Sequence, residues 1–257
     1  MAGGHSHGTH GLYLHGHSPL HELAPECKIA AAVASVFAIV ATPREQWWAF
    51  AAHALVLLVV IRVATIPTRL VARRLVFEVP FVAFAFFLPF IGQGDRVDLG
   101  VLSLSRDGLW AAWNILAKGS LGVSVSVVLA STTTMAELLR GLERLRVPRP
   151  LVLIASFMVR YLDVIAGQMQ RMKVARLSRG YDPRWIWQSK AWATSAGTMF
   201  IRSYERGERV HLAMLSRGYG GTMPDLFETR TDAGQWRRAL SWPLVHALVT
   251  TAAWVAR

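Results

Sequence analysis

Residues 109–133 read LWAAWNILAKGSLGVSVSVVLASTT, a run in which Lys118 is the single charged side chain. A bilayer core about 30 Å thick requires roughly 20 helical residues, because each residue advances a helix by about 1.5 Å. The run therefore predicts a transmembrane helix, and its many small residues predict a face against which other helices pack. Lys118 is expected near the outer interface, where its long side chain reaches the polar boundary.

Four further apolar runs surround this helix in the sequence. The run at 46–65, which contains AFAAHALVLLVVI, has the length of a full span, whereas the runs at 28–41 and 75–91 are shorter. A last apolar run covers residues 236–256. The expected fold class is all-α: a polytopic membrane protein with about five transmembrane helices and a cytoplasmic coupling domain of long helices.

The composition agrees with a membrane protein better than with a soluble one. The 257 residues are 53% hydrophobic, yet the formal net charge is +12. Soluble domains rarely combine these properties, and nucleic-acid binders, although basic, are seldom so apolar. The single cysteine, Cys27, excludes an intramolecular disulfide and argues against cysteine-rich metal clusters.

Basic residues gather in two segments, which predicts the orientation. The segment at 62–74 carries four arginines and no acid, and residues 135–238 hold 18 of the 28 Lys and Arg residues. The segments at 42–46 and 92–108 instead mix three arginines with four acids. The positive-inside rule then places the N-terminus and both basic segments in the cytoplasm, and the C-terminus outside.

The expected organisation has four parts. They are a flexible His/Gly-rich cytoplasmic tail at 1–22, a membrane domain of four spans at 23–134, a cytoplasmic coupling domain at 135–235 and a C-terminal transmembrane helix at 236–257. The tail holds weak candidates for metal binding: His5, His7, His10, His15 and His17. A tail without a rigid surrounding shell selects metals poorly, so no specific site is predicted there.

The coupling domain is predicted to contain one short and two long helices. The stretch ELLRGLERLRVP, residues 137–148, has the leucine spacing of an amphipathic helix that a proline ends. Long helices are expected from residue 151 to the glycine at 180, and from about 187 to 217. Both end with the same five residues, LSRGY, at 177–181 and 215–219.

The repeated ending is the most specific local signal in the chain. A glycine after the last turn and an arginine within it are ordinary features of a helix C-terminus. Capping does not require the serine, arginine and tyrosine to recur. Two copies of the ending therefore favour two equivalent contacts, each made with one of two equivalent receptors. The candidate contact residues are Ser178, Arg179, Gly180, Ser216, Arg217 and Gly218.

The motifs of common enzymes are missing from the sequence. There is no G-x-x-x-x-G-K-[ST] phosphate loop, no G-x-S-x-G and no H-E-x-x-H. His53 and His246 lie in apolar runs, where packing or hydrogen bonding is a more common role than metal binding. The chain therefore shows no recognisable motif of its own for binding ATP or for hydrolysis.

Three stretches resemble the T component of energy-coupling factor transporters, and within it the cobalt-type CbiQ proteins. HSPLHELAPECKI, residues 17–29, resembles the family's S-x-L-H-x-L-x-P-x-x-K pattern, although Glu26 and Cys27 replace a pair that is usually more basic. STTTMAELLRGLERLRVPRPLVLIASFMVRYL, residues 131–162, is similar to the central segment. The two Ser-Arg-Gly ends match paired Ala-Arg-Gly motifs, with Ser in the first position.

The resemblance implies a membrane scaffold in a multi-subunit importer of the plasma (inner) membrane. Such a scaffold is not an enzyme and binds no cofactor of its own. Arg179 and Arg217 would dock into two ABC-type ATPase subunits, which bind the ATP and Mg²⁺. A separate substrate-binding membrane S component would carry the cargo, and a small accessory membrane subunit would complete the complex within the lipid. The subfamily implies cobalt, with nickel or another micronutrient as the alternative.

Two other function classes stay open from the residues alone. A membrane-embedded enzyme acting on an anionic lipid-linked substrate would need clustered acids or a nucleophile near the cytoplasmic face, and none is apparent. A membrane-anchored nucleic-acid binder would use the basic excess of residues 135–238. The positive-inside rule already explains that excess, so no nucleic-acid partner is expected.

Overall fold

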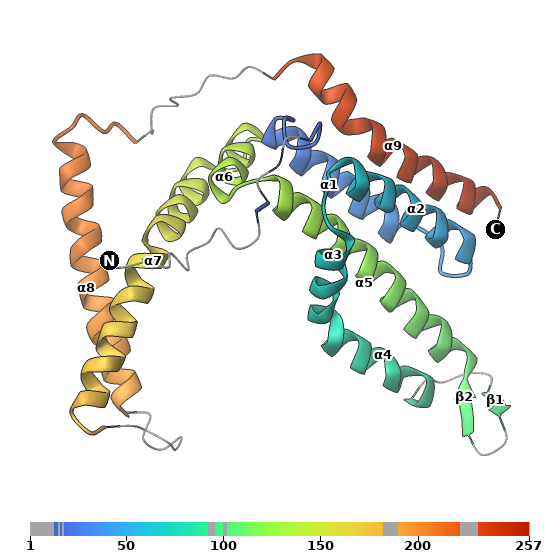
Figure 1. Ribbon diagram of the computed structural model, residues 1–257, viewed down its shortest axis with the longest axis horizontal. Coiled ribbons are helices and arrows are strands. Elements are labelled where there is room, and N and C mark those ends of the chain that lie inside the picture. Colours follow the sequence, from blue (N-terminus) through green and yellow to red (C-terminus); the bar gives the residue numbers. More distant parts are fainter. Residues whose placement is uncertain are drawn as a thin grey trace. The chain divides into compact units, whose positions relative to one another are not determined.

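The protein is described by a computed structural model in which the chain forms two compact units (Figure 1). The larger unit comprises residues 10–152 and 231–257, and the second unit, here called the α7–α8 unit, comprises 1–9 and 153–230. The structure describes residues 13–14, 16, 18–91, 96–99, 102–181, 190–221 and 231–256. The five candidate tail histidines lie outside these residues.

The larger unit is built almost entirely from helices. Its helices, in chain order, are α1 (Pro25–Val40), α2 (Trp47–Val63), α3 (Thr68–Arg74), the 3-10 turn η1 (Leu75–Glu78), α4 (Val79–Ile91), α5 (Arg106–Thr132), α6 (Met135–Arg144) and α9 (Ala233–Val255). Between α4 and α5, the strands β1 (Arg96–Leu99) and β2 (Leu102–Ser105) form an antiparallel hairpin that pairs Arg96 with Ser105. The predicted helical fold class is confirmed, and this hairpin is a small addition to it.

Helix α1 lies at the centre of the larger unit. It packs against α9, α5 and α6, while α2 packs against α9 and α5. One shared cluster of buried side chains comes from these helices: Ala32, Ile39, Phe50, Leu57, Leu121 and Val125. A hydrophobic core therefore holds the first, second and fifth helices together.

Helix α5 also packs closely against α4. A Cβ atom at Gly108 would lie 2.4 Å from the carbonyl oxygen of Leu88 and 2.8 Å from the Cα atom of Pro89, so only glycine fits at this contact. Ser105 caps the start of α5 by accepting a hydrogen bond from the Gly108 amide at 3.2 Å. The hairpin thus ends where a tight helix contact begins.

Two described helices are long and apolar enough to cross a membrane, namely α5 and α7 (Arg149–Ser178). The pair α3 and α4 adds a third candidate if both belong to one span with a 62° bend. α2, at 17 residues, is apolar but shorter. The prediction for α5 is confirmed, whereas the apolar character of α7 extends further than expected for a helix outside the membrane.

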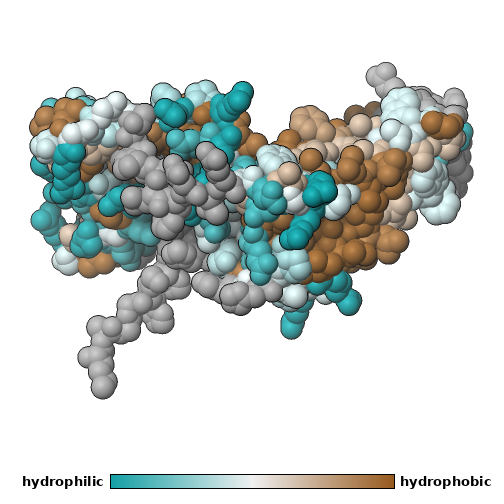
Figure 2. Space-filling view, turned by 90° about the horizontal axis from the view of Figure 1, so that it is seen from above, coloured by the Kyte–Doolittle hydropathy of each residue, from teal (hydrophilic) through white to brown (hydrophobic). Residues whose placement is uncertain are grey.

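Many apolar side chains of the larger unit face outward. Phe81, Phe86 and Ile91 of α4 are 62%, 65% and 74% exposed, and Leu248 of α9 is 68% exposed. A broad hydrophobic surface, brown in Figure 2, covers much of the visible face of the larger unit. An exposed apolar area of this kind is the normal surface of a protein that is surrounded by lipid.

Several polar groups inside the larger unit are hydrogen-bonded across helices. The Nδ1 atoms of His53 (α2) and His246 (α9) lie 2.8 Å apart, and His53 Nε2 lies 3.0 Å from the Thr42 hydroxyl. Both histidines are fully buried and hydrogen-bonded, which is the role that the sequence predicts, while their pairing with one another was not predicted. Nζ of Lys118 donates to the Val40 carbonyl at 2.7 Å and so caps the end of α1, next to the segment at 42–46 that the sequence predicts to lie outside.

The predicted flexible tail is too long at its C-terminal end. Ser18 is 2% exposed, and its hydroxyl lies 2.7 Å from Nδ1 of His21. The amide of Leu14 donates to the carbonyl of Ser131 at 3.0 Å. Residues 18–22 thus belong to the folded larger unit, and Leu14, whose carbonyl lies 3.1 Å from Nε2 of His21, bonds to the end of α5.

The α7–α8 unit consists of two long helices, α7 and α8 (Lys190–Leu215). The end of α7 contacts the start of α8, where Nη1 of Arg176 donates to the Ser195 hydroxyl at 3.4 Å. The first half of α7 instead faces the second half of α8 across shared pockets. The two helices therefore run in opposite directions, and most of their side chains are exposed.

Candidate functional site

The end of α7 adopts a complete Schellman motif. The amide of Tyr181 donates to the carbonyl of Arg176 at 3.2 Å, and the amide of Gly180 donates to the carbonyl of Leu177 at 2.9 Å. Gly180 has φ +74°, the left-handed conformation that glycine adopts without strain. The motif satisfies carbonyls at the helix end and stops the helix at a defined residue.

The end of α8 repeats this geometry. The amide of Tyr219 donates to Met214 at 3.0 Å, and the amide of Gly218, whose φ is +81°, donates to Leu215 at 3.0 Å. The same two backbone bonds thus close both helices. The repeated LSRGY sequence is a repeated three-dimensional structure.

The serines of the two endings are equivalent as well. The Ser178 hydroxyl donates to the Ala175 carbonyl at 3.0 Å, and the Ser216 hydroxyl donates to the Ala213 carbonyl at 3.0 Å. Both serines are used within their own helix, so their structural role is to close the last turn. These local hydrogen bonds do not involve the arginine side chain of LSRGY, so helix capping does not explain why an arginine stands there.

Arg179 and Arg217 occupy the same position, directly before the left-handed glycine. Both are exposed, and neither guanidinium forms a hydrogen bond or ion pair with another described residue. The six candidate residues lie at the two helix ends as two separate groups, because α7 and α8 are antiparallel. Each group holds one planar cation, which suits bidentate contact with a carboxylate or a carbonyl pair of another molecule.

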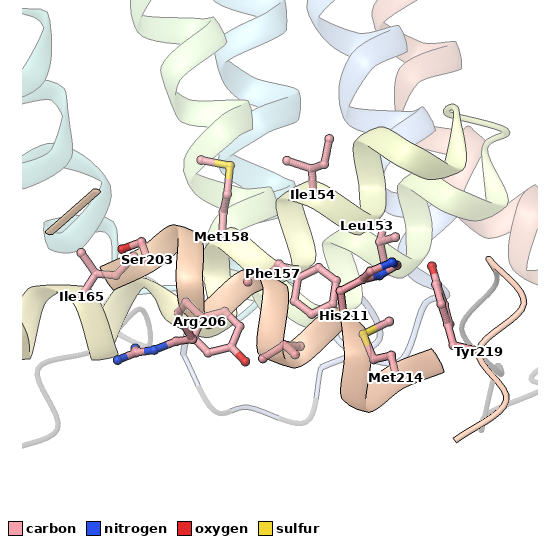
Figure 3. Close-up of a pocket in the computed structure, with 13 residues that line it drawn as sticks. Leu153, Ile154, Phe157, Met158, Ile165, Ser203, Arg206, His211, Met214 and Tyr219 are labelled. Carbon is pink, nitrogen blue, oxygen red and sulfur yellow. The ribbon is translucent and has the colours of Figure 1, made fainter. Parts of the chain in front are cut away.

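An apolar pocket of about 510 Å³ lies between α7 and α8. Phe157 of α7 and His211 of α8 lie next to one another across it, with Met214 and Tyr219 towards the α8 end (Figure 3). The aromatic ring of Tyr219 thus connects the helix ending to the interhelical pocket. Sequence reasoning missed this link, because the pocket forms only when two distant helices pair.

The N-terminal motif forms a second polar assembly, in the larger unit. Nζ of Lys28 donates to the His21 carbonyl and to the Thr132 carbonyl, each at 2.9 Å. Ser18 in turn holds the His21 ring. The residues of the S-x-L-H-x-L-x-P-x-x-K pattern therefore fasten the chain before α1 to the end of α5.

Glu26, one of the two departures from the family pattern, forms a buried ion pair. Its Oε1 lies 3.1 Å from Nη1 of Arg144 on α6 and accepts a hydrogen bond from the Thr231 hydroxyl, and Glu26 is 4% exposed. Glu26 precedes the predicted span at 28–41. Burial raises the pKa of this carboxyl, but the bonds from Thr231, its own backbone and Arg144 outweigh burial and lower it.

The described residues contain no group of three or more His, Cys, Asp or Glu side chains able to hold a metal ion. Cys27 is buried and unpaired with another cysteine. The two arginine-bearing helix ends are therefore the candidate functional site in the described part of the chain.

Apolar helices with an outward hydrophobic surface, and a duplicated arginine ending on a helix pair, define a helical membrane protein with two equivalent arginine-bearing helix ends. Residues 16–227 match the family named CbiQ and described as "Cobalt transport protein", and the chain belongs to that family. The resemblance inferred from the sequence motifs is therefore confirmed.

Individual relatives agree with this assignment. The energy-coupling factor transporter transmembrane protein EcfT of Listeria innocua is 26% identical over 243 residues, covering 89% of this chain and 90% of the relative. EcfT of Bacillus selenitireducens is 24% identical over 253 residues, covering 93% and 90%. The cobalt transport protein CbiQ of Rhodobacter capsulatus is 29% identical over 151 residues, which span 58% of each chain.

The relatives are named as membrane components of transporters, and the chain is a membrane component of an energy-coupling factor transporter rather than an enzyme. Such a transporter has several subunits, so this chain works with partners.

Proposed function

We propose that this chain is the energy-coupling scaffold of an ATP-driven importer and that its two helix ends dock into two ABC-type ATPase subunits. The proposal rests on the structural equivalence of the two helix ends. Both have the same backbone hydrogen bonds, a glycine in the left-handed conformation and an exposed arginine before it. Two identical sockets on two ATPase copies would require two identical contacts.

The helix ends are suited to transmit force. Helices α7 and α8 have 30 and 26 residues, so each is about 40 Å long. A Schellman ending stops each helix sharply, so the arginine holds a defined position relative to the helix axis. Movement of an ATPase socket would displace the whole helix and, through it, a separate substrate-binding membrane subunit.

The proposed cargo is cobalt ion, with nickel or another micronutrient as the alternative. Support comes from the family description and from the name of the Rhodobacter capsulatus relative. The metal would bind to the separate S component, as the resemblance implies, and this chain would supply coupling alone. ATP and Mg²⁺ would bind to the ATPase subunits.

The proposed location is the plasma (inner) membrane, with the N-terminus and the α7–α8 unit on the cytoplasmic side. The basic excess of residues 135–238 supports this orientation through the positive-inside rule. ATP is cytoplasmic, so the docking ends must face that side if they contact ATPases.

The test replaces Arg179, Arg217 or both by alanine in the complete transporter. Truncating one partner of a desolvated charged contact costs about 2–5 kcal/mol, so each single variant is expected to lose ATPase binding at least tenfold and the double variant to lose metal uptake. Co-purification measures subunit binding, and radioactive cobalt measures uptake. A double variant that retains full ATPase stoichiometry and normal uptake would refute the proposal.

A further inference from the structure

Each helix-end arginine lines a pocket with a second arginine from the opposite helix. Arg179, directly after α7, shares a pocket of about 810 Å³ with Arg202 of α8, and Tyr181 lies at the same pocket. Arg217, after α8, shares another of about 810 Å³ with Arg160 of α7 and with Tyr219. The antiparallel pairing produces this arrangement, because the end of each helix lies beside the interior of the other.

The two pockets are strongly basic. Arg171 and Arg176 also line the pocket at Arg179, and neither pocket has an Asp or Glu among its lining residues, all of which belong to the described chain. Arg160 and Arg202 are exposed and form no ion pair with another described residue. Arg179 with Arg202, and Arg217 with Arg160, thus share pockets that have no acidic lining residue, and this local positive charge favours an anionic ligand.

An apolar area adjoins each basic pocket. The pocket at Arg217 shares Phe157, Met214 and Tyr219 with the apolar pocket of Figure 3. The pocket at Arg179 shares Met172 and Arg176 with an apolar pocket of about 630 Å³. A ligand that fits would carry negative charge beside apolar groups, and Tyr and Arg are the residue types that most often dominate protein contacts.

We infer that each LSRGY end is one half of a two-arginine socket, completed by Arg202 at Arg179 and by Arg160 at Arg217, and that each socket binds a carboxylate-bearing segment of one ATPase subunit. This inference rests on the proposed function. It adds Arg160 and Arg202, which lie outside the repeated LSRGY sequence, and it specifies that the partner surface is acidic. An acidic protein segment is favoured over a lipid phosphate, because a lipid does not require two sockets with the same backbone geometry.

The experiment uses the complete transporter in lipid nanodiscs and compares Arg160→Gln, Arg202→Gln and the double variant with Arg209→Gln. Arg209 is the matched control, since it is an exposed arginine of α8, lines neither socket and lies 3.9 Å from Glu205. ATPase dissociation is measured at increasing salt. Each socket variant is expected to weaken binding about tenfold (about 1.4 kcal/mol) and to flatten its salt dependence, with less than a twofold change for Arg209→Gln.

A second pair of variants, Arg160→Lys and Arg202→Lys, tests geometry and guards against misfolding. Lysine keeps the charge but cannot form a bidentate fork, so an intermediate loss of binding is expected with unchanged helical content by circular dichroism. Loss of binding in Arg179→Ala and Arg217→Ala together with normal binding in Arg160→Gln and Arg202→Gln would overturn the socket while leaving the proposed function intact. Normal binding in all four variants would overturn both.

Lipid composition separates the two sources of negative charge. If the socket binds an ATPase carboxylate, the loss caused by the Gln variants is expected to be the same in zwitterionic and anionic nanodiscs. A loss that appears only in anionic nanodiscs would assign the socket to a lipid phosphate and overturn the inference.

Discussion

At Arg179 and Arg217, the local structure of the helix end does not determine which side chain is present. The glycine that follows each arginine has a positive φ, and the tyrosine after it supplies the amide of the Schellman bond. The local structure therefore accounts for the glycine, but any side chain that tolerates a helix end would satisfy the arginine position. This difference is why a repeated arginine predicts a contact and a repeated glycine alone does not.

Residue-level reasoning predicted these endings well, because capping depends on a few neighbouring residues. It missed the buried pair of Glu26 and Arg144, since 118 positions separate the two residues and no local pattern connects them. Arg160 and Arg202 were missed for the same reason, because their pockets exist only once α7 and α8 pair.

Glu26 gives a prediction on pH and stability. Its folded-state pKa is lowered below the ordinary value of 4.5, so the ionised carboxylate stabilises the fold above pH 4.5. That stabilisation is lost as the pH falls from 4.5 through the folded-state pKa. We expect Glu26→Gln to lower the free energy of unfolding by about 1–3 kcal/mol at pH 7. Below the folded-state pKa of Glu26, the variant and the unsubstituted chain are expected to have the same free energy of unfolding.

Thermal unfolding of the detergent-purified chain across this pH range provides the measurement. Glu143→Gln is the control, because Glu143 is half exposed and its distance to Arg149 is 3.9 Å. A change within about 0.5 kcal/mol is expected for that surface pair. Equal pH dependence with and without Glu26 would show that the buried pair does not stabilise the fold.

At the scale of elements, hydrophobic periodicity predicted the long helices but not the short elements between them. The amphipathic helix predicted in residues 137–148 is α6. It begins two residues earlier, at Met135, because a capping box starts it: Thr134 accepts from the Glu137 amide at 3.3 Å, and Glu137 accepts from the Thr134 amide at 2.8 Å. Neither the α3 helix within the basic segment at 62–74 nor the β1–β2 hairpin was predicted. Both are short, and short elements depend on tertiary contacts more than on pattern.

The contact between α6 and α1 gives a prediction at this scale. A Cβ atom at Gly141 would lie 2.8 Å from Cδ1 of Ile29 and 2.9 Å from the carbonyl carbon of Pro25, so Gly141→Ala must push the two helices apart. A loss of about 1–3 kcal/mol in stability is expected from overpacking. Thermal unfolding in detergent measures it.

Gly122→Ala is the matched control, because a Cβ atom there would have no neighbour within 4 Å. That variant is expected to be neutral or slightly stabilising, since alanine favours helix over glycine by up to about 1 kcal/mol. Equal stability of the two variants would contradict the close α6–α1 contact.

At the scale of the whole molecule, the two units correspond to two tasks in the proposed function. The larger unit has the buried polar bonds and outward apolar surface of a lipid-embedded body. The α7–α8 unit is exposed and basic and carries both arginine endings. The sequence predicted the membrane class and the family, whereas the positions of the helices around α1 required long-range contacts that periodicity does not encode.

The most direct test of the central claim is site-specific crosslinking in the assembled transporter. Cys27 is the only cysteine, so Cys27→Ser provides a background in which Ser178→Cys and Ser216→Cys each place one thiol beside a helix-end arginine. Glu205→Cys, on exposed α8, serves as the control. We predict that each end crosslinks to one ATPase subunit, that the double variant captures two, and that the control captures none; failure of both ends to crosslink in a complex that hydrolyses ATP would contradict the account.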